Sequence, residues 1–200
     1  MVAGFGEFDG LENVDIAHTR DEFRRWLKAN HDTERECWLK LKRGKPVQGE
    51  FAYLDAVEEA LCFGWIDGHL KAFEGQGTLQ RFSPRAKDSS WSELNKERVR
   101  RLERLGLMTD AGRACLPAMG PRSFHIDKDI VRELKEARLW TRFKGFPALY
   151  QRVRADNIQR VKSNPEEYRR RLDSLIEHTR KGEHYGEWDD YGRLSAWQER

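Results

Sequence analysis

The stretch that most constrains the fold of this chain is ALCFGWIDG, residues 60–68, in which an apolar run ends in an acid between glycines. Gly64 ends a predicted helix over 53–62, and Trp65-Ile66-Asp67 begins a predicted strand. A carboxylate among apolar residues loses hydration and needs a partner that favours its charge. The nearest candidates lie a short way downstream, and they are Arg81, Arg85 and Lys87.

Helical and strand patterns alternate through the first 120 residues. A capping box at Thr19 and Glu22 predicts the first helix, and the alternation over 37–42 predicts a strand. A second capping box at Ser90 and Glu93 predicts a helix to about Leu105. Between them, residues 65–73 and 79–82 flank a turn at Gly75–Gly77 and predict a hairpin.

After a predicted linker over 117–126, the pattern is helical only. Residues 127–137 form one predicted helix, Pro147 opens the next, and Asn164-Pro165 opens a third that Gly182 ends. The chain is therefore predicted to be an α+β protein. We expect a small mixed core over 15–120 and a helical C-terminal extension, 121–200, packed on it.

Composition excludes several classes of protein. The 200 residues are 38% hydrophobic, with seven Trp and ten Phe, which is enough apolar material for a core. Three widely spaced Cys predict neither a disulfide framework nor a metal site, and no cofactor is predicted. No signal peptide and no apolar run of membrane-spanning length is recognised, so a cytoplasmic location is expected.

The residues around Asp67 are predicted to form a binding pocket for a small anionic ligand or an acidic partner. Asp67, Arg81 and Arg85 would form its polar wall, and Trp65 and Trp91 its apolar floor. A structural ion pair between Asp67 and an arginine is the alternative interpretation. The full candidate set is Trp65, Asp67, His69, Arg81, Arg85, Lys87, Trp91 and Asn95.

Whether the chain is an enzyme stays open at this stage. His69 stands two residues after Asp67 and would share its strand face, so either could act as a base while the arginines stabilise an oxyanion. No serine triad is recognised, and Cys62 is expected to be a buried, unreactive thiol.

The basic segment 138–171 suggests a third class of function. It carries ten basic and three acidic residues, a net charge of +7, with Trp140 and Tyr150 among them. Nucleic-acid binding is one interpretation, and packing against acidic parts of the same chain is the favoured one.

The C-terminal segment at Trp188-Asp189-Asp190 carries two alternatives of its own. It would either complete a site or dock the C-terminus through Trp188, Leu194 and Trp197. The ligand and the oligomeric state are not predictable from the sequence.

Three blocks carry a resemblance to a known family, namely AVEEALCFGWIDG at 56–68, the stretch 80–112 from Gln-Arg-Phe-Ser-Pro-Arg to Asp-Ala-Gly, and residues 146–194. With them the chain resembles the YdeI/OmpD-associated family, also called bacteriocin-protection proteins, over residues 20–195. The resemblance implies a bacterial stress or defence protein linked to tolerance of bacteriocins or cationic antimicrobial peptides. It implies no catalytic residue. The residues that match its motif positions are Trp65, Asp67, Arg81, Pro84, Arg85, Trp91 and Asn95.

Overall fold

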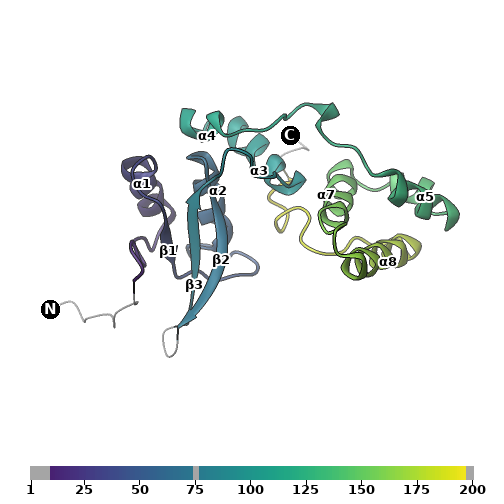
Figure 1. Cartoon of the computed structure of the whole chain (residues 1–200), viewed down its shortest axis with the longest axis horizontal. Helices are drawn as coiled ribbons and strands as arrows, with labels where there is room; N and C mark the ends of the chain where they lie inside the picture. The colour runs from purple at the N-terminus through teal and green to yellow at the C-terminus, as the bar shows by residue number, and fades with distance from the viewer. Residues whose placement is uncertain (1–9, 74–76, 197–200) are drawn as a thin grey trace. The chain divides into compact units, whose positions relative to one another are not determined.

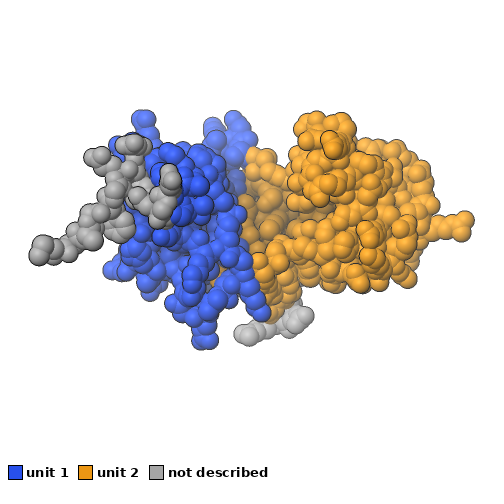
Figure 2. All heavy atoms as spheres, turned by 90° about the horizontal axis from the view of Figure 1, so that it is seen from below, with its two compact units in different colours: residues 1–89, 102–116 blue, residues 90–101, 117–200 orange. Residues whose placement is uncertain are grey.

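A computed structural model describes residues 10–73 and 77–196 (Figure 1). Most of the predicted turn at 75–77 and the residue Trp197 lie outside the described residues. The chain divides into two compact units, drawn in separate colours in Figure 2. Unit 1 comprises residues 1–89 and 102–116, and unit 2 comprises residues 90–101 and 117–200.

Unit 1 is a three-stranded antiparallel sheet with helices. Its elements are α1 (Arg20–Asn30), β1 (Cys37–Leu39), α2 (Tyr53–Cys62), β2 (Trp65–Phe73), β3 (Gly77–Pro84) and α4 (Asp110–Ala114). The sequence predicted the starts of α1 and β2, and the Thr19 hydroxyl caps α1 by accepting from the N–H of Glu22 at 3.2 Å. Figure 1 shows β2 and β3 as a long ribbon with α2 behind it.

The strand order is β1-β3-β2, so β3 is central. Phe82 of β3 lies opposite both Cys37 and Asp67, and its ring packs 5.5 Å from that of Phe23 on α1. Phe82, Cys37 and Phe23 are fully buried, so this inner face of the sheet forms the core of unit 1. Arg81, next along β3, points to the outer face together with its partner Trp38.

Unit 2 is helical. Its elements are most of α3 (Glu93–Arg104), a short 3-10 turn (Pro121–Ser123), α5 (Lys128–Glu136), α6 (Trp140–Lys144), α7 (Ala148–Gln159) and α8 (Pro165–Lys181). Its largest core cluster contains Phe143, Tyr150 and Leu175. As predicted, Asn164 caps the start of α8, and Gly182 ends it with a φ of 76°.

The predicted start of α3 at Ser90 is wrong, because the helix begins one short turn later. The helix begins at Glu93, and the Ser92 hydroxyl accepts from the N–H of Asn95 at 3.2 Å. Ser90 instead accepts a hydrogen bond from Arg160 at 2.9 Å. The α+β class is confirmed. No helix within the described ranges is both long and apolar enough to cross a bilayer.

The C-terminal segment after α8 docks within unit 2. Asp190 is buried and accepts two hydrogen bonds from Arg98 of α3, at 2.6 and 2.7 Å. Leu194 is fully buried beside Leu149 and Val153 of α7. These contacts match the docking interpretation of the segment around Trp188.

Candidate functional site

Asp67 does not pair with Arg81. Its carboxylate accepts a hydrogen bond from the Tyr53 hydroxyl at 2.5 Å, on the inner face of the sheet. The Arg43 guanidinium lies over the Tyr53 ring, 4.4 Å from its centroid. Arg81 projects from the other face, where its Nε donates to Glu36 at 2.6 Å. The predicted ion pair fails because neighbouring residues of a strand point to opposite faces.

His69 and Asp67 lie on different faces of the sheet, contrary to the prediction. The register shifts between Asp67 and Leu70, which is a β-bulge, and a bulge reverses the alternation of side chains. The His69 ring packs edge-on against Trp38, 5.3 Å between centroids. Trp38 donates its indole N–H to Glu36, and this bond, together with Arg81, lowers the pKa of the Glu36 carboxyl.

The remaining candidates in unit 1 have separate surroundings. Trp65 is buried in the core, packs edge-on against Trp26, and donates its indole N–H to the carbonyl of His31 at 3.0 Å. Arg85 donates to the Ser89 hydroxyl at 3.0 Å. Lys87 is exposed. Asp67 and Arg81, two members of the predicted polar wall, therefore project from opposite faces of the sheet.

Trp91 and Asn95 belong to unit 2. The Asn95 side-chain oxygen accepts from Arg98 at 2.7 Å, so the amide is satisfied within α3. Trp91 is buried.

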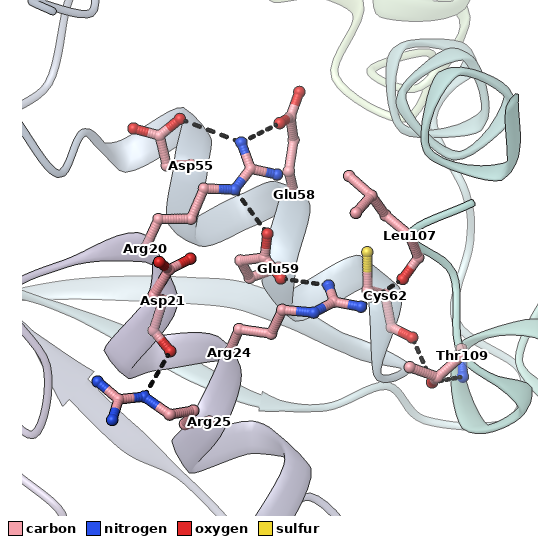
Figure 3. A network of polar contacts seen from close by, with 11 residues as sticks. Arg20, Asp21, Arg24, Arg25, Asp55, Glu58, Glu59, Cys62, Leu107 and Thr109 are labelled. Carbon is pink, nitrogen blue, oxygen red and sulfur yellow. Dashed lines mark hydrogen bonds and ion pairs between the residues drawn. The ribbon is translucent and has the colours of Figure 1, made fainter. Parts of the chain in front are cut away.

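A polar network in unit 1 joins α1 to α2 (Figure 3). Both oxygens of Glu59 are hydrogen-bonded, one by Arg20 and the other by Arg24, each at 2.6 Å. Arg20 also bonds Glu58 at 3.0 Å and lies 3.5 Å from Asp55. Since the carboxylates of Glu58 and Glu59 are almost fully buried, these bonds hold the two helices in register.

Cys62 stands at the end of the same network. Burial and the neighbouring Glu59 raise the pKa of its thiol to about 12, so the thiol is protonated at neutral pH. Its carbonyl accepts from the Thr109 hydroxyl at 2.6 Å, which ties α4 to α2. Cys62 is thus buried, as the sequence predicted.

Unit 2 contains a charged cavity of about 460 Å³ that sequence reasoning missed. Its charged lining comes from α3 and α7, and its other wall from the segment before α5. The lining residues are Glu93, Glu97, Arg100, Met119, Gly120, Ser123, Phe124 and Arg152. Glu97 accepts from Arg100 at 2.8 Å and from Arg152 at 3.0 Å, so one carboxylate joins both guanidinium groups.

Glu93 is the unusual member of this lining. Its side chain is 1% exposed, with Lys96 Nζ at 2.9 Å from one oxygen and Arg152 Nε at 3.4 Å from the other. Neither contact has the alignment of a hydrogen bond, and no other residue that the structure describes donates to these oxygens. A buried carboxylate normally accepts several hydrogen bonds, so Glu93 retains capacity for a donor inside the cavity.

The backbone beside Glu93 is itself fixed by a carboxylate. The Glu93 N–H donates to Asp156 of α7 at 3.0 Å, and burial raises the pKa of Asp156. This contact attaches the start of α3 to α7, the two helices that line the cavity. A sequence signal did exist, because Glu93, Glu97 and Arg100 follow the spacing of one helix face. Nothing in the sequence pointed to Arg152.

Fold and site together define an α+β protein with a charged cavity in its helical unit. The chain belongs to the family described as a domain of unknown function, DUF8412, which matches residues 16–115. The matched region includes the network of Figure 3 and the α3 residues of the cavity, but not Arg152. No curated protein and no solved structure matches the chain.

Within the described parts of the chain, no group of three or more His, Cys, Asp or Glu side chains could hold a metal ion.

Proposed function

We propose that this chain binds a small molecule with an anionic group, and that the cavity between α3 and α7 is the binding site. The observation that carries this proposal is the difference in exposure between the charges of the lining. The side chains of Arg100 and Arg152 are 27% and 31% exposed, whereas those of Glu93 and Glu97 are 1% and 2% exposed. An entering ligand therefore meets guanidinium groups first.

Both guanidinium groups have donors left for a ligand. Arg100 uses one terminal nitrogen for Glu97 and the other for the carbonyl of Met119, and Arg152 hydrogen-bonds Glu97 through one nitrogen. A guanidinium has several N–H groups in a planar fork, which suits carboxylate and phosphate oxygens. Apolar contact would come from Met119 and Phe124, and the volume falls within the range of small-molecule sites.

The cellular role follows from the resemblance of residues 56–68 and 80–112 to YdeI/OmpD-associated proteins. On that basis we place the binding activity in a cytoplasmic response to envelope stress or to bacteriocins. An acidic partner segment is the other occupant that the guanidinium groups would accept.

Two other functions have less support. The enzyme hypothesis placed Asp67 or His69 as a base beside the arginines, and Asp67 lies on the face of the sheet opposite Arg81. Nucleic-acid binding needed free arginines beside exposed aromatic rings, yet Tyr150 is fully buried. Arg169 and Arg171 already bond acidic side chains within unit 2.

Ligand-observed saturation-transfer NMR on the full chain tests the proposed function. Pools of small carboxylates and of phosphate monoesters serve as probes, and we expect at least one pool to show transfer. Arg152→Ala should lose that transfer, and Arg152→Lys, which keeps the charge but not the fork, should weaken it. Arg160→Ala is the matched control, because Arg160 follows α7 but does not line the cavity. Unchanged transfer with a folded Arg152→Ala would refute the site.

A further inference from the structure

On the basis of the proposed function, we infer that the ligand is a zwitterion with an apolar body, of the α-amino acid class. Its carboxylate would be bound by Arg100 and Arg152, and its ammonium group by Glu93. The two ends of the ligand would thus contact the accessible and the buried charges of the same cavity.

The inference begins with the unmet hydrogen-bonding capacity of Glu93. This carboxylate is 1% exposed, and neither oxygen accepts a hydrogen bond from any residue in the described part of the chain. Lys96 and Arg152 supply opposite charge at 2.9 and 3.4 Å without an aligned hydrogen bond, so a donor that enters the cavity would add the hydrogen bonds that this carboxylate lacks. An ammonium group offers both several N–H donors and the opposite charge.

The charge of the lining favours a dipolar ligand over a singly charged one. Two carboxylates, Glu93 and Glu97, and two guanidinium groups, Arg100 and Arg152, share the lining, and Lys96 outside it pairs with Glu93 at 2.9 Å. A ligand with only an anionic group would leave the Glu93 oxygens without a hydrogen-bond donor. A ligand with only a cationic group would have to pass the exposed arginines, which repel it.

The apolar part of the lining indicates that the zwitterion carries an apolar side chain. Met119 and Phe124 line the same cavity, whose volume of about 460 Å³ is larger than the charged ends alone would fill. Apolar surface on the ligand would be removed from water against these residues. An amino acid with an aliphatic or aromatic side chain therefore fits better than glycine.

Four matched pools of compounds test the ligand class on the full chain. The first holds the standard amino acids, the second their N-acetyl derivatives, the third their amides, and the fourth the 2-hydroxy acids with the same side chains. Each pool is measured by saturation-transfer NMR, and binders are titrated by calorimetry. We expect the free amino acids with apolar side chains to bind roughly tenfold or more tightly than any of the other three forms.

A variant at Glu93 gives the second readout. Glu93→Gln keeps the shape of the side chain and removes its charge. We expect it to weaken amino-acid binding by about tenfold while leaving the weak binding of the N-acetyl derivatives unchanged. Glu103→Gln, on the same helix but outside the cavity, should leave both unchanged.

The possible failures separate this inference from the proposed function. If the N-acetyl derivatives or the hydroxy acids bind as tightly as the free amino acids, the inference of a zwitterionic ligand is wrong and the proposed anion-binding cavity stands. If the amides bind as tightly as the free amino acids, both the zwitterion inference and the proposed anion binding are wrong. Absence of binding in every pool, or unchanged affinity in Glu93→Gln, would overturn the zwitterion, and the carboxylate and phosphate pools would then decide the proposed function.

Discussion

Both units of this molecule bury carboxylates of one helix beside arginines. The two units differ in how many hydrogen bonds the carboxylate oxygens accept. In unit 1, Glu59 of α2 receives one hydrogen bond on each oxygen, from Arg20 and Arg24. In unit 2, Glu93 of α3 is equally buried, has charged neighbours, and receives no hydrogen bond from the described residues. The first carboxylate lies in a closed network, and the second lines a cavity of about 460 Å³.

This difference separates a structural role from a binding role. A buried ion pair is weak support for function when each carboxylate oxygen already accepts a hydrogen bond, because the network then fixes two helices. For Glu93, a buried carboxylate with unused acceptor capacity beside a cavity, we propose a binding role. The predictions below test the two kinds of network against each other.

The largest effect is expected at Glu59. Glu59→Gln leaves two arginines facing an amide in a buried network, and we expect it to lower the free energy of unfolding by about 3–5 kcal/mol. Urea denaturation followed by circular dichroism measures the loss. The matched control is Glu103→Gln, whose pair with Arg113 is half-exposed and should contribute less than about 1 kcal/mol. Similar losses in both variants would contradict a special role for the closed network.

Gly112 tests how tightly unit 1 is packed around that network. A Cβ at Gly112 would lie 2.2 Å from the carbonyl oxygen of Cys62, so backbone must move in Gly112→Ala. We expect a loss of about 1–3 kcal/mol in the same denaturation assay. Gly120→Ala at the cavity of unit 2 meets no atom within 4 Å and should be close to neutral. A neutral Gly112→Ala would show that α4 is loosely attached to α2.

Glu93→Gln allows the stability contribution of the unit 2 carboxylate to be compared with that of Glu59 in unit 1. The substitution removes the counter-charge of Lys96 but no aligned hydrogen bond, so it should lower the free energy of unfolding by about 1–3 kcal/mol, less than Glu59→Gln. The same urea titration, run side by side on the two variants, gives the difference. A loss equal to that of Glu59→Gln would mean that the unit 2 network is as complete as that of unit 1.

The smallest effect concerns Glu36 on the outer face of the sheet. The Trp38 indole and Arg81 hold the pKa of Glu36 below its ordinary value of 4.5. Because the folded-state pKa is the lower one, the contribution to stability is present above 4.5 and is lost as the pH falls through the folded-state value. The free energy of unfolding of Glu36→Gln should differ from that of the parent chain by less than about 1 kcal/mol at neutral pH. Denaturation midpoints of the two proteins should converge in acid, and a difference that grows in acid would contradict the sign.

Much of the fold was predictable because it depends on local signals. The capping box at Thr19, the Asn164-Pro165 pair and the glycine at 182 each mark a helix end through backbone chemistry that involves few neighbours. The bulge after Asp67 was not predictable in the same way. It depends on pairing with β3 and moves His69 to the face opposite Asp67.

The candidate site was less predictable because its members come from distant segments. Arg81 found its partner in Glu36, 45 positions away, rather than in the nearby Asp67. Glu93 and Glu97 are spaced as neighbours on one helix face, but Arg152 joins them only through the packing of α7 against α3. Proximity along the sequence misled the choice of partner for Asp67, and tertiary packing created the cavity.

The most direct test of the central claim follows the arginine side chains themselves by NMR. In the ¹⁵N-labelled full chain, the Nε–Hε resonances of Arg152 and Arg100 report on the cavity, and those of Arg20 and Arg24 report on the closed network. On addition of the pooled apolar amino acids, we predict that the first pair shifts in a saturable way while the second pair stays in place. Saturable shifts confined to Arg20 and Arg24, or no shift at Arg152, would contradict the account.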